Sequence, residues 1–337
     1  MVAFPGVAPD ALSRQIPIET MRGIAVIMLV SYHVVGPAAG TALDISYPHP
    51  LRLYADFFVD LRMPFFAFIA GYIYALRPVA PEQYSAFVAG KFRRLYLPGA
   101  VAMAAFALCA ALLGNRFAVS ITEVWQVFVF SYAHFWFLQA ILVLFVCVGL
   151  VDCLTGHRSA PALLAASCVL YLTDFHFGTR FFSVDSAFYL LPFFLLGVVF
   201  LRHAAGIMRE SGRLTIVLVV ICGASALWNV RIYFETEMLS LARRDLQSLG
   251  FGLSACVLAM LWLPRVAWLE RLSPYAFTIY LYHVFGTAGM RLLCDRLEIN
   301  ATEPRFVLGV MAGVLLPVLL HRLATRTPFP GHLVLGR

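Results

Sequence analysis

Long apolar stretches recur along almost the whole chain, and most of them are long enough to cross a lipid bilayer as a helix. A bilayer core of about 30 Å requires roughly 20 apolar residues. Hydrophobic residues make up 61% of the 337 residues and charged residues only 13%, whereas a soluble domain is about 45–50% apolar. We therefore predict an all-α, polytopic membrane protein with about ten transmembrane helices. The expected spans lie near residues 17–36, 54–76, 95–113, 134–152, 160–174, 186–202, 213–229, 247–263, 273–290 and 305–323.

The connections between these stretches are short, and no soluble domain, low-complexity tract or internal repeat separates them. One integral-membrane domain is expected over residues 1–337, with a helical core of about 15–325. The small residues of 36–42 would also suit a signal-peptide cleavage site after the first stretch. A disposable segment, however, would not need the Arg22 and His33 that this stretch carries.

Basic residues divide unevenly between the two sides of this topology. Fourteen fall on one side and nine on the other, and the richer side is assigned to the cytoplasm. Both termini are then cytoplasmic, Arg22 lies toward the cytoplasmic half of the first span, and His33 lies toward its outer end. The excess of basic residues is expected to fix the orientation of the protein in the membrane and to contact anionic lipid headgroups or phosphates. Because no loop is long enough for a basic domain, a nucleic-acid partner is not expected.

Seven cysteines are spread through the chain, and five of them fall inside apolar runs, where a thiol usually behaves as a small hydrophobe. No CxxC motif and no Cys/His cluster is present in the sequence. Neither a disulfide framework nor a metal site is therefore predicted.

Arg22 and His33 are costly residues for a membrane span, and such residues indicate functional sites by default. Their separation of eleven residues is close to three turns, so both face the same way, about 16 Å apart along the axis. A neutral His33 can take a proton from a hydroxyl that attacks a thioester, and Arg22 can hold a phosphate or carboxylate. The alternatives are a histidine that only packs against a neighbouring helix and an internal Glu19–Arg22 pair.

Further candidates lie in other predicted spans, and those that open the second span share the predicted depth of His33. Asp56, Asp60 and Arg62 open the second span, where one aspartate could orient the imidazole and the group could contact substrate. Acidic residues at a solvated helix start are the alternative, which the helix dipole favours. His283 lies within an apolar run, where it could bind substrate. The alternative is a histidine that only packs between helices.

A basic segment, Lys91-Phe-Arg-Arg94, precedes the third span on the predicted cytoplasmic side. Positive charge at Lys91, Arg93 and Arg94 would suit a phosphate-rich cytosolic donor. The alternative is a plain anchor of the positive-inside kind.

Six segments, taken in order, form a recurring pattern over nearly the whole chain. They are an acid, Arg-Gly-x-Ala and a later His (Glu19, Arg22, Gly23, Ala25, His33), Met63 to Tyr72, a basic segment ending in proline (Lys91, Arg94, Pro98), His134 to Leu138, Pro192 to Gly197, and Tyr280 to His283. Together they resemble the membrane acyltransferases of acyltransferase family three.

The resemblance implies transfer of an acyl group, usually acetyl from acetyl-CoA, to a hydroxyl of a surface polysaccharide or its lipid-linked precursor. His33 would be the catalytic residue and Arg22 its partner in handling the donor, with Lys91 and Arg94 in a basic motif usually written with two arginines. The chain departs from the family pattern at Lys91, at Arg62, where histidine is frequent, and at Ala70, where serine is common.

The resemblance implies an enzyme of a bacterial inner membrane. Acyl-CoA would enter from the cytoplasm with its phosphates near the basic segment, and its thioester would reach His33. No permanently bound cofactor is expected, and the partners would be acyl-CoA, a carbohydrate acceptor and membrane lipids. A covalent acyl-His33 intermediate stays open. The alternative function is a secondary transporter or flippase whose buried charges bind substrate or protons.

Overall fold

The computed structural model describes residues 17–326 and residue 335. Both chain termini, which were predicted to be cytoplasmic, lie outside the described residues, as do positions 15–16 of the expected helical core. Among the described residues the elements are helical, apart from one isolated bridge between Phe130 and Phe181. The helices are α2 (Ile18–Val35), α3 (Pro50–Phe57), α4 (Val59–Leu76), η1 (Pro81–Gln83), α5 (Tyr84–Lys91), the π-helical turn η2 (Phe92–Tyr96), α6 (Leu97–Leu112), α7 (Gln126–Val129), α8 (Trp136–Thr155), α9 (Ala160–Leu172), α10 (Val184–Arg202), α11 (Ala204–Arg209), α12 (Ser211–Thr236), α13 (Leu246–Trp262), α14 (Ala267–Glu270), η3 (Ser273–Tyr275), α15 (Ala276–Arg296) and α16 (Thr302–Ala324).

Within the described residues, seven helices are long and apolar enough to cross a membrane, or eight if the bent pair Leu246–Trp262 and Ala267–Arg296 forms one span. The all-α membrane class is confirmed, whereas the predicted number of ten spans is not. The shortfall has physical reasons. Helix α9 has 13 residues, which at 1.5 Å per residue is about 20 Å and too short for the bilayer core. The helices of the bent pair meet at 110°.

The third span is longer than predicted. Helices α5 and α6 join through η2 into one candidate span over Pro81–Leu112, although the prediction began at residue 95 because the basic segment was placed outside the membrane. Lys91 instead lies beside aromatic rings, with its Nζ 3.5 Å from the centroid of Phe145. The amphipathic stem of lysine and a cation–π contact allow this placement.

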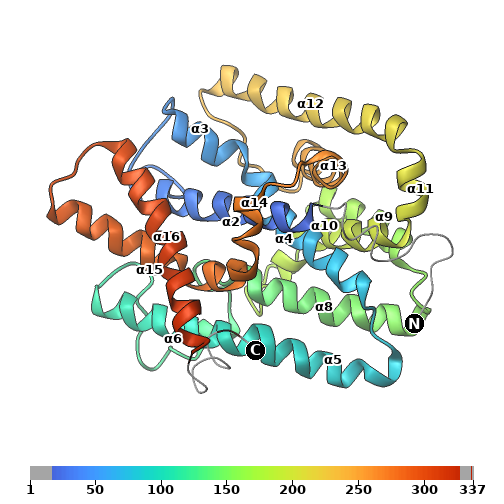
Figure 1. The fold of residues 1–337 in the computed structure, drawn as a ribbon, viewed down its shortest axis with the longest axis horizontal. Coiled ribbons are helices and arrows are strands. Elements are labelled where there is room, and N and C mark those ends of the chain that lie inside the picture. The colour runs from blue at the N-terminus through green and yellow to red at the C-terminus, as the bar shows by residue number, and fades with distance from the viewer. Residues whose placement is uncertain (1–16, 327–334, 336–337) are drawn as a thin grey trace.

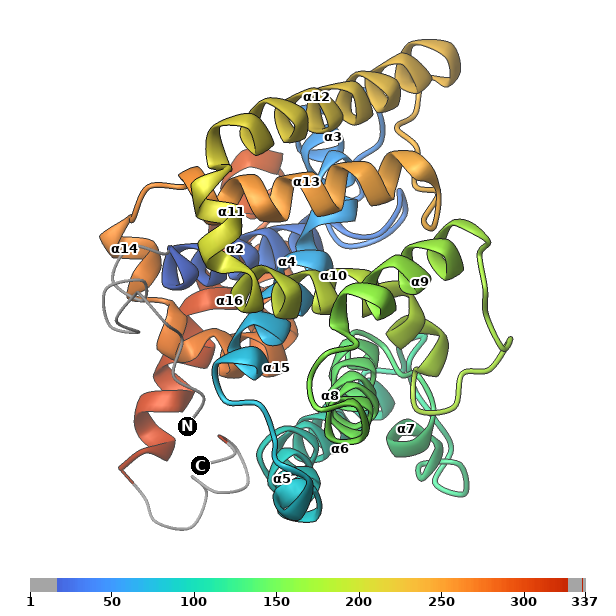
Figure 2. The same ribbon diagram turned by 90° about the vertical axis from the view of Figure 1, so that its right-hand side faces the viewer.

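Helix α2 lies inside the bundle, where α4, α13, α14, α15 and α16 all contact it. In both views of the fold, α12 follows one edge of the molecule and the α5–α6 helix follows the opposite edge (Figures 1 and 2). The residues of α2 are therefore shielded by neighbouring helices on most sides, and the polar groups on this helix must find partners or a cavity within the protein.

Glycines allow a close helix contact between α4 and α10. A Cβ atom at Gly71 would meet the carbonyl oxygen of Phe194, and one at Gly197 would meet the carbonyl oxygen of Phe68. Small residues let the backbones of membrane helices approach in this way. The contact holds α4 in a fixed position beside α2, which helps to fix the depth of the residues near His33.

An ion pair and a hydrogen bond to the same carboxylate join three helices at the opposite end of the bundle from His33. Asp152 of α8 is fully buried, and its Oδ2 lies 2.5 Å from Nη2 of Arg202 in α10. The Tyr74 hydroxyl of α4 donates to the same carboxylate over 2.7 Å. A buried carboxylate is stable only with such partners.

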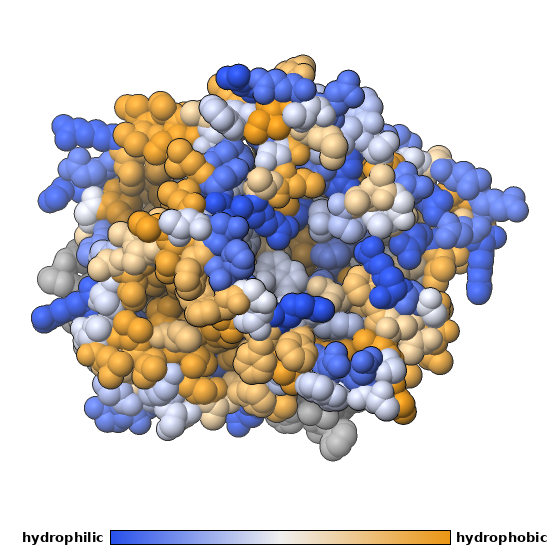
Figure 3. Space-filling model, turned by 180° about the vertical axis from the view of Figure 1, so that it is seen from behind, coloured by the Kyte–Doolittle hydropathy of each residue, from blue (hydrophilic) through white to orange (hydrophobic). Residues whose placement is uncertain are grey.

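Helix α12 is packed very differently from the central helices. Only 6% of its apolar window is buried, against 72% for α4, and its main contact is α13. Figure 3 shows the back of the molecule, where hydrophobic residues form a broad zone and hydrophilic residues project at both side margins. This arrangement fits a protein whose flanks face lipid and whose helix ends face water.

Candidate active site

Helix α2 carries Arg22 and His33 at its two ends, and we name the ends of the membrane domain after them. The helix ends at Gly36, whose φ of 95° is strained for other residues, and where a Cβ would also crowd Thr41. About 16 Å of helix separates the two side chains along the axis. They therefore cannot touch, as their spacing predicted, and they lie at opposite ends of the helix.

The imidazole of His33 is held in one tautomer. Its Nδ1 lies 2.9 Å from the carbonyl oxygen of Leu29, one turn earlier in α2. Because a carbonyl oxygen only accepts hydrogen bonds, the ring proton is on Nδ1, and Nε2 carries a free lone pair. The ring is half-buried because it lines a cavity. His33 therefore presents a proton acceptor to that cavity.

Two further histidines pack around His33. The ring centroid of His283 in α15 lies 4.6 Å from that of His33, and the centroid of His134 lies 5.9 Å away. His283 is fully buried and its Nδ1 faces the Ile279 carbonyl over 2.9 Å, as His33 faces Leu29. Its Nε2 has no hydrogen-bond partner among the described residues. Within residues 17–326, no cluster of histidine, cysteine or acidic residues is arranged to hold a metal ion.

His134 lies in the turn before α8, outside the spanning helices. The Tyr280 hydroxyl of α15 donates to the His134 backbone carbonyl over 2.8 Å and so anchors this turn. Burial, together with the neighbouring His33, lowers the pKa of His134 from its ordinary value to about 3. The ring is therefore neutral at physiological pH, and it does not repel a positive charge that forms on His33.

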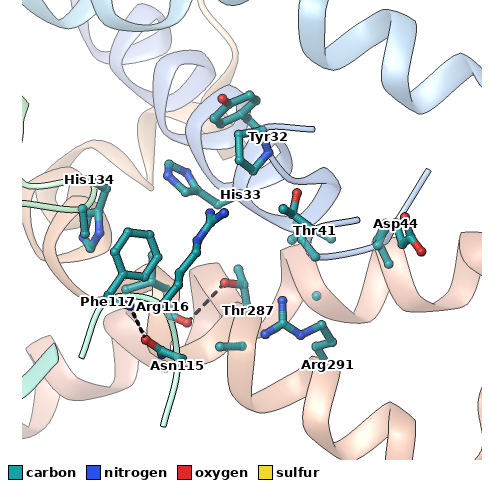
Figure 4. Close-up of a pocket in the computed structure, with 18 of the residues that line it drawn as sticks. Tyr32, His33, Thr41, Asp44, Asn115, Arg116, Phe117, His134, Thr287 and Arg291 are labelled. Carbon is teal, nitrogen blue, oxygen red and sulfur yellow. Dashed lines mark hydrogen bonds between the residues drawn. The ribbon is translucent and has the colours of Figure 1, made fainter. Parts of the chain in front are cut away.

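A cavity of about 820 Å³ opens beside these histidines, and this volume is within the range of small-molecule sites. Figure 4 shows that His33 and His134 face it from one side, that Arg116 reaches across it toward His33, and that Thr287 and Arg291 lie on the α15 side. Its lining also includes Tyr32, Thr41, Asp44, Phe106, Asn115, Phe117 and Trp136. The combination of hydrogen-bonding groups and aromatic rings suits a polar ligand with an apolar face.

Arg22 lies far from this cavity, at the other end of α2. Its Nη1 donates to the Ser273 hydroxyl over 2.7 Å and to Glu19 over 3.2 Å. The predicted alternative of a Glu19–Arg22 pair is therefore present. The guanidinium is still partly exposed, with 22% of the side chain accessible, so it retains access to a ligand at that end.

The acidic residues of the second span do not orient His33. Asp56 pairs with Arg52 and accepts from the Tyr47 hydroxyl over 2.6 Å, while both oxygens of buried Asp60 have no partner among the described residues. Burial and the Asp56 carboxylate raise the pKa of Tyr47, so its phenol stays protonated. The possibility that an aspartate orients the imidazole was wrong, because the Leu29 carbonyl fills that position.

Arg62 lies behind the cavity rather than in it. Its guanidinium carbon is 3.6 Å from the ring centroid of Tyr32, and its Nη1 donates to the Ala55 carbonyl over 2.8 Å. Tyr32 lines the cavity next to His33. Arg62 therefore supports a wall of the site, whereas neither aspartate of the second span is among the lining residues.

The basic segment belongs to a third location, on α5 and η2. Lys91 is half-buried against Phe145, whereas Arg93 and Arg94 are exposed. Lys91 is the last residue of α5, whereas Arg93 and Arg94 lie within the π-helical turn η2, a deviation that is frequent at functional sites. The structure thus brings His33 and His283 together, although His283 is not among the residues that line the cavity. It keeps the basic segment and Arg22 apart from that cavity.

Sequence reasoning missed part of the cavity. His134 was noted only as part of a motif, and Arg116 and Arg291 were counted only as loop charges on the predicted outer side. No local signal distinguishes these arginines from other loop arginines. Their common cavity results from packing of the α6–α7 connection against α15, which a single sequence does not reveal.

The model of acyltransferase family three, described as an acyltransferase domain, matches residues 17–322. The chain belongs to this acyltransferase family. The match runs from the start of α2 into the last turn of α16, so it covers all three histidines and the cavity. No match is found among curated proteins or among solved structures. Membership in the family supports membrane acyltransferase activity and favours it over the transport alternative.

Proposed function

We propose that this acyltransferase moves an acyl group, most simply acetyl, from cytosolic acyl-CoA to a hydroxyl of a surface polysaccharide, an exopolysaccharide or its lipid-linked precursor. The observation that carries the proposal is the free Nε2 lone pair of His33 at the wall of the cavity. A neutral imidazole in this state is the form that a general base requires.

In the proposed reaction, the acceptor hydroxyl lies in the cavity within reach of His33 Nε2. Its oxygen attacks the thioester carbonyl carbon while Nε2 takes the hydroxyl proton. The carbon–sulfur bond then breaks, the proton passes from the imidazolium to the CoA sulfur, and the products are an ester and free CoA. The ring of His134, which is neutral at physiological pH, lies beside His33 without adding a like charge, and the ring of His283 packs against that of His33.

The donor would approach from the Arg22 end. Exposed Arg93 and Arg94, with Lys91, offer positive charge to the CoA phosphates, and the pantetheine arm would follow α2 past Arg22. The positive-inside rule favours an orientation with the Arg22 end in the cytoplasm and the His33 end outside. This proposal includes a bacterial inner membrane and two cytoplasmic termini.

The direct test follows radiolabelled acetyl-CoA into glycan in membranes that contain the full chain. His33→Ala is expected to lower label transfer by about 10²–10⁴-fold, the usual contribution of a proton-transfer group. His176→Gln is the matched control, because this histidine is exposed and only bonds within its own loop. It is expected to keep the activity of the unchanged chain.

Undiminished label transfer in His33→Ala would remove His33 from the proposed mechanism. Absence of transfer to any acceptor, combined with uptake of acceptor-like solutes, would favour the transporter alternative. Label that stays on the protein after acetyl-CoA is withdrawn, and that depends on His33, would replace direct transfer with a covalent acyl-histidine route.

A further inference from the structure

The charged side chains that line the His33 cavity are not balanced. Arginine contributes Arg116, Arg291 and Arg305, and aspartate contributes Asp44 and Asp295. Arg305 forms an ion pair with Asp295. The cavity therefore holds more positive than negative charge, which matters for any ligand that enters it.

The carboxylate of the remaining aspartate, Asp44, also has a hydrogen-bond partner within the protein. An Asp44 carboxylate oxygen accepts a hydrogen bond from the backbone N–H of Gly40 over 2.5 Å. Among the described residues, neither Arg116 nor Arg291 has a carboxylate partner. The guanidinium carbon of Arg116 lies 4.9 Å from the ring centroid of Phe117. Two guanidinium groups thus line the cavity without an ion-pair partner among the described residues, and three arginines against two aspartates leave the lining with an excess of positive charge.

The positions of the two arginines tie them to the reaction centre. Arg116 comes from the connection between α6 and α7, and Figure 4 shows its guanidinium reaching toward His33. Arg291 comes from α15, two turns after His283, and lies on the other side of the cavity. An anion held by these groups would lie close to a hydroxyl presented to His33.

We propose that the acceptor carries an anionic group, a carboxylate or a phosphate, that Arg116 and Arg291 bind beside the hydroxyl to be acylated. Guanidinium groups bind both kinds of oxyanion through paired hydrogen bonds. Trp136 and Phe117 add ring faces for the sugar, and Asn115 adds an amide that can bond a hydroxyl. This inference rests on the proposed function, because it assigns the acceptor class of the same site.

Binding of three sugar probes to the purified full-length protein tests the inference without any acyl transfer. Methyl glucoside is neutral, methyl glucuronide carries a carboxylate, and glucose 1-phosphate carries a phosphate. The anionic probes are expected to bind about tenfold more tightly than methyl glucoside, as for hydrogen bonds to charged groups. This preference should weaken as salt is raised. The tighter of the two anionic probes identifies the source of the charge as an acidic sugar or a phosphate.

Substitutions connect the preference to the cavity. Arg116→Gln and Arg291→Gln are each expected to lower binding of the anionic probe several-fold with little effect on methyl glucoside. Arg116→Lys should retain part of the preference, because lysine keeps the charge but loses the planar fork. Arg231→Gln is the matched control, since Arg231 lies on α12 and pairs with Glu235.

Equal binding of the three probes, binding of none of them, or an anion preference that survives both glutamine substitutions overturns the inference. The two proposals fail separately. Label transfer from acetyl-CoA without any anion preference would remove the inference and keep the proposed function. An arginine-dependent anion preference without label transfer would remove the proposed function and keep the anion-binding site.

Discussion

At the scale of single residues, the site depends on where protons are placed. His33 and His283 both direct Nδ1 to a carbonyl four residues earlier in their helices, so both have a free Nε2. The sequence singled out His33 and His283 as candidate site residues within apolar runs. It could not predict that their rings touch, because the contact depends on how α15 packs against α2.

Replacement of His283 tests the contact between these rings. His283→Leu removes the lone pair beside His33, where an imidazolium forms during transfer. We expect kcat to fall roughly tenfold or more with little change in KM, the effect of losing one hydrogen bond to a charged group. His283→Gln, which restores a polar atom near the Nε2 position, should recover part of kcat. The measurement is steady-state label transfer from acetyl-CoA.

A purely structural role for His283 would give a different result. Both variants would then lose folded protein in parallel, as judged by size-exclusion chromatography in detergent. The glutamine variant would show no recovery of kcat per folded molecule. A structural defect would also change KM together with kcat.

At the scale of helices, the expected positions were largely right and the lengths were less so. Each expected range holds a helix, because apolar runs determine where helices form. The extension of α6 backward through η2 and α5 was missed, since charged residues normally mark a membrane boundary. Phe145 and Phe87 accept Lys91 there, and such tertiary partners are not visible in a local pattern.

The contact of α4 with α10 gives the clearest prediction at this scale. Gly197→Ala places a methyl group against the Phe68 carbonyl oxygen and 2.7 Å from the Tyr72 nitrogen. Overpacking of this kind costs about 1–3 kcal/mol. The variant is therefore expected to unfold at a lower temperature in detergent than the unchanged chain.

The matched control for this prediction is Gly223→Ala in α12, where an added Cβ meets nothing within 4 Å. Alanine is also the better helix former by up to about 1 kcal/mol. The unfolding temperature of this variant should stay the same or rise. A Gly197→Ala protein as stable as the Gly223→Ala protein would mean that α4 and α10 can separate without cost.

At the scale of the whole molecule, the membrane class followed from composition, but the number of spans did not. Hydropathy alone predicts ordinary membrane spans at α9, α13 and α15. It does not reveal that α9 is short or that the chain bends between α13 and α14. The orientation is a separate question, since it depends on loop charges. It decides which compartment meets the cavity and which meets the basic segment.

Cysteine labelling tests the orientation directly. Ser120→Cys, exposed in the connection after α6, lies at the His33 end, and Glu82→Cys, exposed before α5, lies at the Arg22 end. We expect a membrane-impermeant maleimide to label Ser120→Cys in intact cells above the level of the unchanged chain. Glu82→Cys should gain label only after the cells are permeabilised, and the reverse pattern would invert the proposed topology.

The loose packing of α12 has a consequence for which sequences this fold accepts. Because most of its side chains face outward and α13 is its main neighbour, a position on α12 requires apolar character rather than a given shape. The α4–α10 contact is the opposite case, where one methyl group matters. A saturation library should therefore tolerate exchanges among apolar residues almost freely along α12, while α4 accepts few.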